Sequence, residues 1–141
     1  MNHLNASQKG ELAEIRMASE FKKLGGDVFF PFGASKIDAM VYIGGSTYKV
    51  QVKTARTRES EVNAVRATLR SSEGYDYHDV VDAFVVYNPD LDECYWLYTH
   101  EVGKTTASIC TVGEDEVHPP NRERATFAED VLIQERFESQ N

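Results

Sequence analysis

The feature that most constrains this fold is a pair of alternating segments, residues 37–43 and 46–53, separated by Gly44-Gly45. Each segment alternates apolar and polar side chains, which is typical of a β-strand with one buried face. Two consecutive glycines suit a two-residue hairpin turn, because its central positions favour positive φ. Residue 43 then pairs with residue 46, so the numbers of paired residues always sum to 89. The sequence therefore predicts a β-hairpin of defined register.

This register separates the hairpin into an apolar face and a polar face. On the polar face, Asp38 lies directly opposite Gln51, and Lys53 follows one step along the same face. Directly opposed residues have Cβ atoms about 5 Å apart. The pairing therefore predicts a polar cluster of Asp38, Gln51 and Lys53. The pairs on the other face are all apolar: Ala39 with Val50, Ile37 with Val52, and Val41 with Tyr48.

A helix is predicted before the hairpin, over residues 8–24. Ser7 is a candidate N-cap, and Gly25-Gly26 is a permissive stop. Glu14 falls inside the apolar stripe of this helix, and a buried carboxylate is costly unless a positive or hydrogen-bonding group meets it. Glu14 is therefore a candidate functional residue. The stripe consists of Ala13, Met17, Phe21 and Leu24, with Ala18 at its edge and Glu11 at its margin, whereas Arg16, Glu20 and Lys23 are predicted to face away.

The rest of the chain indicates further strands within a single domain spanning residues 1–141. Pro31 is expected to limit a short strand over 28–32. The final segment, 126–139, leaves helix and extended structure equally open. Elsewhere the patterns predict a basic turn at 56–58, a strand over 64–72 with Val65, Ala67 and Leu69 on one face, a second hairpin of 82–87 and 94–98, and a strand near 108–112. Trp96 is expected in the core or at an oligomer interface.

The net charge of −8 conceals an uneven distribution along the chain. Residues 1–72 hold 11 Lys/Arg and 7 Asp/Glu, a net of +4, so residues 73–141 carry −12. Local potential rather than total charge decides whether a polyanion can approach, so a nucleic-acid partner remains open. The sequence has no long apolar run and no signal-peptide pattern, and its two cysteines lack CxxC spacing. We therefore expect a cytoplasmic protein that is not secreted, with reduced thiols.

An inward Glu14 together with Asp38, Gln51 and Lys53 on one sheet face predicts a divalent-metal site. Mg²⁺ prefers hard oxygen ligands, which carboxylates and an amide oxygen supply, and Mn²⁺ is a possible substitute. Asp38 is the expected central ligand, with Gln51 and Glu14 beside it. Lys53 is expected to orient or help deprotonate a water, or to stabilise charge on a phosphate.

These motifs resemble the PD-(D/E)xK nuclease superfamily over roughly residues 8–100. The resemblance is closest to its small single-domain branches, the group I intron homing endonucleases and the archaeal Holliday-junction resolvases. A K-G-x-x-x-E helix is matched by Lys9 to Glu14, and the core acid by Asp38. Gln51-Val52-Lys53-Thr54 matches the Q-V-K-T form of the homing-type branch, although the usual proline before the core acid is replaced by Ile37.

The resemblance implies an α/β (α+β) fold with a restriction-endonuclease-like core, in which an N-terminal helix precedes a mixed central β-sheet with flanking helices. It implies Mg²⁺-dependent hydrolysis of DNA phosphodiesters, with Glu14, Asp38, Gln51 and Lys53 as catalytic residues and Glu11 as an alternative acid. The substrate is expected to be double-stranded or branched DNA. A homodimer or homotetramer is expected, because cutting two strands needs two active sites. Candidate phosphate contacts are Lys9, Arg56, Arg58, Arg66 and Arg70.

Simpler interpretations remain open for the same residues. Glu14 is also compatible with a structural ion pair, and Asp38 with Lys53 is compatible with a cross-strand salt bridge. The arginines suit a solvated face as well as they suit DNA. With Gln51 in place of an acid, the chain could also be a catalytically inactive DNA-binding or assembly module, or a soluble interaction domain without a nucleic-acid partner.

Overall fold

The predicted hairpin lies at the centre of the fold, in a computed structural model that describes residues 3–58, 61–71, 73–113, 116–117 and 125–138. Strands β2 (Ala39–Ile43) and β3 (Ser46–Thr54) pair antiparallel, with Ala39 opposite Val50. Gly44 and Gly45 have φ values of 59° and 79°, as a type I′ turn requires. The predicted register is therefore confirmed for residues 39–43 with 46–50. The predicted pairing before Ala39 is wrong, because the Asp38 N–H donates to the carbonyl oxygen of Val50, the partner of Ala39, and because Ile37 and Val52 join different hydrophobic clusters.

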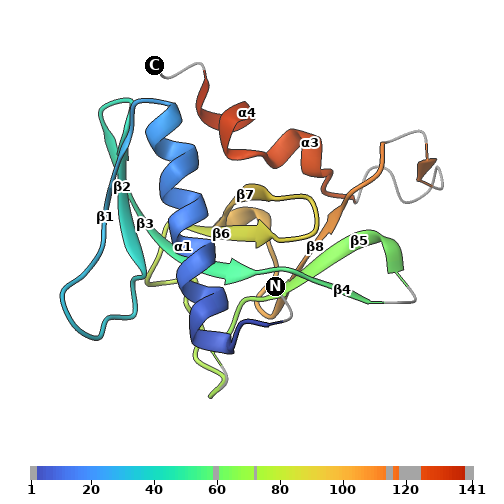
Figure 1. The fold of residues 1–141 in the computed structure, drawn as a ribbon, viewed down its shortest axis with the longest axis horizontal. Coiled ribbons are helices and arrows are strands. Elements are labelled where there is room, and N and C mark those ends of the chain that lie inside the picture. Colours follow the sequence, from blue (N-terminus) through green and yellow to red (C-terminus); the bar gives the residue numbers. More distant parts are fainter. Residues whose placement is uncertain (1–2, 59–60, 72, 114–115, 118–124, 139–141) are drawn as a thin grey trace.

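A five-stranded mixed sheet forms around this hairpin, in the order β1-β2-β3-β6-β7 (Figure 1). Strand β1 (Asp27–Phe29) pairs antiparallel with β2 and ends before Pro31. Strands β6 (Ala83–Asn88) and β7 (Glu93–Tyr98) form the predicted second hairpin, and β6 pairs parallel with β3. The N-terminal helix and the mixed sheet confirm the expected fold class.

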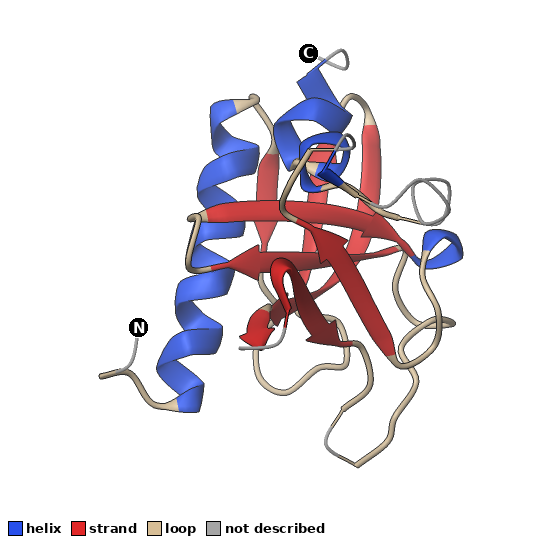
Figure 2. Ribbon diagram, turned by 90° about the vertical axis from the view of Figure 1, so that its right-hand side faces the viewer, coloured by secondary structure: helices blue, strands red, loops and turns tan. Residues whose placement is uncertain are grey.

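A separate three-stranded sheet, in the order β4-β5-β8, lies at one end of the molecule (Figures 1 and 2). Its strands are β4 (Arg56–Arg58), β5 (Glu61–Thr68) and β8 (Thr106–Cys110). The prediction of a turn at 56–58 is wrong, because this segment pairs antiparallel with β5 and places Arg56 opposite Arg66. The apolar face predicted for β5 is confirmed, since Val65, Ala67 and Leu69 are buried.

Helix α1 (Ala6–Lys23) packs on one face of the five-stranded sheet (Figure 1). Its N-cap is Asn5 rather than Ser7, because Asn5 Oδ1 accepts from the Gln8 N–H at 2.9 Å and Gln8 Oε1 accepts from the Asn5 N–H at 3.0 Å. This reciprocal pair satisfies two helix-end donors. Gly25, with φ 81°, follows the helix end as expected. The buried residues of the stripe are Ala13, Met17 and Phe21.

The prediction that Arg16 and Glu20 face away from the core is wrong. Arg16 Nε donates to Asp92 Oδ1 at 2.7 Å, and an Arg16 guanidinium nitrogen lies 3.0 Å from Glu20 Oε1. Asp92 also accepts from the Tyr87 hydroxyl at 2.8 Å. These bonds fasten the helix to the turn between β6 and β7, so a polar face of α1 contacts the sheet.

The five-stranded sheet has a hydrophobic cluster on each of its two faces. Every residue of β6 is therefore buried. Helix α1 and helix α4 (Ile133–Phe137) cover one side, where Trp96 lies. The three-stranded sheet and helix α3 (Ala128–Val131) cover the other. The C-terminal segment is thus helical, with a break at Leu132, whose φ and ψ are −55° and 139°.

Three smaller features complete the fold. A 3₁₀ turn, η1 (Thr99–Glu101), follows β7. Cys94 is buried, Cys110 is half-buried, and both are free thiols, as expected. Within the part of the chain that the structure describes, no helix is long and apolar enough to cross a membrane.

Candidate active site

Asp38 lies one residue before β2 and is fixed to β3 by two hydrogen bonds. Its N–H donates to the Val50 carbonyl oxygen at 3.0 Å, and its Oδ2 accepts from the Val52 N–H at 2.8 Å. The two bonds go to the residues on either side of Gln51, so Asp38 is held beside this part of β3. Burial raises the pKa of Asp38, although the Val52 N–H and the Lys53 ammonium act in the opposite direction.

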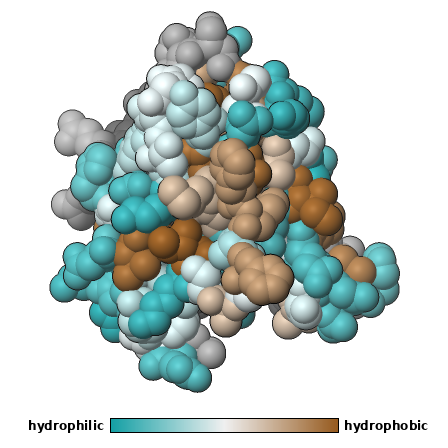
Figure 3. All heavy atoms as spheres, turned by 90° about the vertical axis from the view of Figure 1, so that its left-hand side faces the viewer, coloured by the Kyte–Doolittle hydropathy of each residue, from teal (hydrophilic) through white to brown (hydrophobic). Residues whose placement is uncertain are grey.

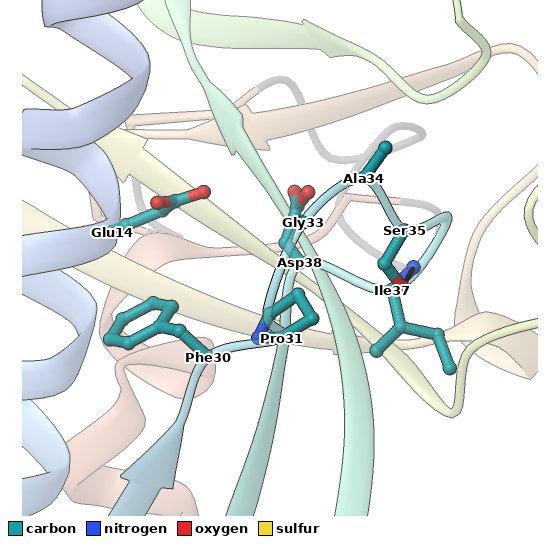
Figure 4. A pocket seen from close by; sticks show the side chains of 8 residues that line it. All are labelled: Glu14, Phe30, Pro31, Gly33, Ala34, Ser35, Ile37 and Asp38. Carbon is teal, nitrogen blue, oxygen red and sulfur yellow. Dashed lines mark hydrogen bonds between the residues drawn. The ribbon is translucent and has the colours of Figure 1, made fainter.

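Glu14 extends from α1 toward Asp38, as Figure 4 shows. It is half-buried, and both carboxylates line a cavity of about 360 Å³ whose other wall is the loop of residues 30–37. Burial, and then the Asp38 and Glu11 carboxylates, raise the pKa of Glu14. The Asp38 charge thus disfavours the Glu14 charge across a shared cavity, and two acids placed in this way form a site suited to a cation.

Gln51 supplies a buried oxygen on β3, the strand to which Asp38 is hydrogen-bonded. Its side chain is 8% exposed, and Oε1 is buried without a hydrogen-bond partner. An unpaired buried amide oxygen is costly, so such a group calls for a ligand or an ordered water. Asp38 Oδ2 accepts from the N–H of Val52, the next residue of β3.

Lys53 is half-buried on the same side of β3 as Gln51. Burial lowers the pKa of its ammonium, whereas the Asp38 carboxylate raises it. Lys53 Nζ lies 5.0 Å from the centre of the Tyr77 ring, on a loop that the sequence patterns did not single out. Lys53 therefore has two neighbours that favour a positive charge, one acidic and one aromatic.

Two simpler interpretations, a structural ion pair at Glu14 and a cross-strand salt bridge between Asp38 and Lys53, do not describe this geometry. Among the described residues, Glu14 makes no hydrogen bond or ion pair with a cation, and Asp38 and Lys53 are not within salt-bridge distance. No three His, Cys, Asp or Glu side chains in the described part gather at metal-binding spacing. The candidate oxygen ligands are thus two carboxylates and the Gln51 amide.

Some of the predicted DNA-binding residues surround Lys53. Lys9, Lys53 and Arg56 line one cavity of about 490 Å³ between the start of α1 and the end of β3. Arg56 and Arg66 line a second cavity of about 270 Å³ on the three-stranded sheet. Arg56 belongs to both, so the basic side chains run from the candidate active site onto that sheet.

The remaining predicted residues lie farther from this path or outside the described side chains. Glu11 is exposed and does not line the Glu14 cavity. Arg70 is half-buried and lies close enough to the Asp76 carboxylate to interact with its charge. The side chain of Arg58 lies outside the described residues.

The helix, the mixed sheet and the polar end of the hairpin define a restriction-endonuclease-like fold. A family model for the PD-(D/E)XK endonucleases matches residues 4–130, and the chain belongs to that family. Among solved structures, a bacterial homing endonuclease, I-Ssp6803I, has the same fold, with a TM-score of 0.69, 19% sequence identity, and 96% of each chain covered. No curated protein matches the chain significantly.

Proposed function

We propose that this protein is a divalent-metal-dependent endonuclease that hydrolyses DNA phosphodiester bonds, of a homing-endonuclease-like or junction-resolving type. One observation carries the proposal: Glu14 and Asp38 share a cavity, and on β3, to which Asp38 is hydrogen-bonded, the Gln51 oxygen is buried without a partner. Membership of the endonuclease family gives this geometry its chemical meaning. The likeness to a homing endonuclease supports the fold that holds the site.

The oxygens at this site fit Mg²⁺, with Mn²⁺ as a substitute. Carboxylates and an amide oxygen are hard ligands, and Mg²⁺ commonly uses one or two carboxylates together with waters and substrate phosphate. A bound cation would relieve the repulsion between Glu14 and Asp38 and satisfy the Gln51 oxygen. When bound, Mg²⁺ supplies Lewis-acid activation of the phosphate and of water.

The residues of the chain then have distinct parts in hydrolysis. Asp38 is the central ligand, held rigidly by the Val52 N–H, and Glu14 and Gln51 complete the oxygen set. The Lys53 ammonium lies where it can approach the phosphate and offset the negative charge that develops in the transition state. Lys53 also has three donors with which to orient an attacking water.

DNA would approach along the basic cavities next to Lys53. Lys9 and Arg56 are placed to contact phosphates on one side of the scissile bond, and Arg66 extends the contact surface over the three-stranded sheet. Phosphate contacts of this kind position a duplex without reading its sequence. The substrate class is therefore double-stranded or branched DNA.

A cleavage assay on matched DNA forms tests the proposal. Supercoiled plasmid, linear duplex and a four-way junction would be incubated with the protein and Mg²⁺, with EDTA as the blank. We expect cleavage that EDTA abolishes, and the preferred DNA form distinguishes a junction-resolving enzyme from a duplex endonuclease. Absence of cleavage of every form, with Mn²⁺ as well as Mg²⁺, would refute enzymatic activity.

A second candidate function is a DNA-binding or assembly module that has lost catalysis. The observation that favours it is Gln51, because an amide in place of an acid leaves two carboxylates to hold the metal. This module would bind DNA in a salt-sensitive manner, would not hydrolyse it, and would be indifferent to Asp38→Ala. Loss of both binding and cleavage would instead indicate an interaction domain without a nucleic-acid partner.

A further inference from the structure

The loop between β5 and β6 is held rigidly around Tyr77. Asp76 Oδ1 accepts from the His78 N–H at 2.9 Å and lies 2.8 Å from His78 Nδ1. The Tyr77 carbonyl oxygen accepts from the N–H groups of Val80 and Val81 at 2.9 and 3.0 Å. Hydrogen bonds on both sides of Tyr77 therefore fix the direction in which its side chain leaves the backbone.

This loop lies over the face of the sheet that carries Gln51 and Lys53. The His78 ring packs against Phe84 with centroids 5.3 Å apart. Phe84 is the parallel partner of Gln51, and paired residues of adjacent strands point to the same face. The Tyr77 ring, one residue before His78, reaches the Lys53 ammonium of that same face, with Nζ 5.0 Å from the ring centre.

A second aromatic ring supports the first. Tyr75 packs edge-on against Tyr77, with centroids 5.0 Å apart and planes at 68°. Tyr75 also carries a cation, since Lys36 Nζ lies 4.0 Å from the centre of its ring. Lys36 belongs to the segment that includes Ser35 and Ile37, two residues that line the Glu14–Asp38 cavity. The two tyrosines thus connect the Lys53 side of the site with the loop that walls its cavity.

We propose that Tyr77 is a positioning residue that holds the Lys53 ammonium against its ring face, so that the cation stays directed at the reacting phosphate. This role rests on the proposed nuclease function. A lysine has four rotatable bonds and a strongly hydrated head, so a half-buried ammonium without a partner tends to turn toward solvent. The negative face of an aromatic ring restrains the ammonium but leaves its positive charge available. A carboxylate at contact distance would neutralise that charge.

Two substitutions separate the ring from the hydroxyl group. Tyr77→Phe keeps the ring face and is expected to keep the wild-type rate. Tyr77→Leu removes the ring and is expected to lower kcat for plasmid nicking about tenfold, with KM for DNA unchanged, because the ammonium is needed for the reaction rather than for binding. Tyr77→Met serves as a second ring-free variant if the leucine variant does not fold, as judged by its thermal melt.

An NMR readout that needs no activity completes the test. Protons beside an aromatic ring face resonate upfield, so the Lys53 Cε protons should be shifted upfield in the wild type and in Tyr77→Phe and should return to the ordinary lysine position in Tyr77→Leu. Their signal is assigned by its loss in Lys53→Arg. If the wild type does not cut DNA but this pattern holds, the nuclease function fails and the contact stands. An ordinary Lys53 signal in the wild type, or equal kcat in wild type and Tyr77→Leu, would overturn the inference.

Discussion

At the scale of single residues, the two ionised acids of the candidate site lower the stability of the folded protein. Glu14 and Asp38 both have a raised pKa, because burial disfavours both ionised forms and the Asp38 carboxylate further disfavours that of Glu14. When the folded-state pKa of an acid exceeds its unfolded value, ionisation costs folding free energy at pH values above both. As the pH falls below both values, this cost disappears. Acids whose ionised forms are disfavoured in this way are what a cation-binding function predicts.

Asp38→Asn should therefore raise the melting temperature of the metal-free protein by a few degrees at pH 7.5. Asparagine keeps an oxygen that can accept from the Val52 N–H, so the hydrogen bond survives while the charge is removed. The gain should shrink toward pH 4, where the wild-type carboxyl is increasingly protonated. Thermal melts in EDTA at the two pH values measure it. A lower melting temperature than wild type at pH 7.5 would show that the Asp38 charge stabilises the fold.

Gln51→Glu should tighten Mg²⁺ binding and keep cleavage activity. The substitution replaces a neutral oxygen with a charged one of nearly the same size, and an added negative charge at an oxygen site increases its affinity for a divalent cation. Titration calorimetry of Mg²⁺ with both proteins measures the difference. Weaker Mg²⁺ binding by the glutamate variant, or complete loss of cleavage, would exclude Gln51 as a ligand.

At the scale of elements, the hairpin could be predicted because two independent signals agree. Alternation assigns a face to every residue of β2 and β3, and the Gly44-Gly45 turn fixes the register. The Asn5 cap was missed because both Asn5 and Ser7 are good N-cap residues, and the capping box with Gln8 decides between them. The contact of Arg16 with Asp92 joins residues 76 positions apart, and no local pattern reports such a pair.

Local sequence patterns do not predict strand β4 or the course of the Tyr77 loop, and the physical reason is a different one. Residues 56–58 carry no hydrophobic alternation, and they become a strand only because β5 offers them a pairing edge. The Tyr77 ring meets Lys53 through a loop whose course is set by its own hydrogen bonds. Tertiary context decides both. Of the four residues that the sequence predicts for the site, the structure places Glu14 and Asp38 in one cavity, and the catalytic roles of Glu14, Asp38, Gln51 and Lys53 stay predictions.

The three-stranded sheet should contribute to DNA affinity without selecting sequence. Arg56→Ala is expected to weaken binding to unrelated duplexes equally and to reduce the slope of log K against log salt by about 1, because one phosphate contact is lost. Fluorescence anisotropy over a salt series measures this slope. Lys22→Ala is the matched control, since Lys22 is an exposed cation near the far end of α1 that pairs with Asp27. Equal slopes for the Arg56→Ala and Lys22→Ala variants would show that β4 does not contact the DNA phosphates.

At the scale of the whole molecule, one chain offers one candidate site, whereas a duplex has two strands. We therefore propose a homodimer or homotetramer. Figure 3 shows hydrophobic residues gathered on the side of the molecule that carries the β1 edge. Extended exposed apolar patches are uncommon on monomers and often mark an interface. The large apolar side chains exposed in and around β1 and β2 are Phe29, Phe30, Phe32, Met40 and Tyr42.

Phe32→Asp should shift the protein toward monomers, because it places a charge at the most exposed of these side chains. Size-exclusion chromatography with light scattering measures the mass. Leu91→Asp is the control, since Leu91 is another exposed apolar residue, in the turn between β6 and β7, the two strands at the opposite edge of the sheet from β1. A monomeric wild type, or equal loss of assembly in both variants, would contradict this interface.

The most direct test of the nuclease proposal compares two aspartates that flank β3. Asp38 Oδ2 accepts from the Val52 N–H and Asp82 Oδ2 accepts from the Lys49 N–H, each at 2.8 Å, but only Asp38 lines the cavity with Glu14. The measurement is the initial rate of Mg²⁺-dependent nicking of supercoiled plasmid. We expect Asp82→Asn to cut as the wild type does and Asp38→Asn to be slower by at least about a hundredfold, since metal ligation is worth several kcal/mol in the transition state. Equal rates for the two variants, or a wild type inactive with both Mg²⁺ and Mn²⁺, would contradict the proposed nuclease site.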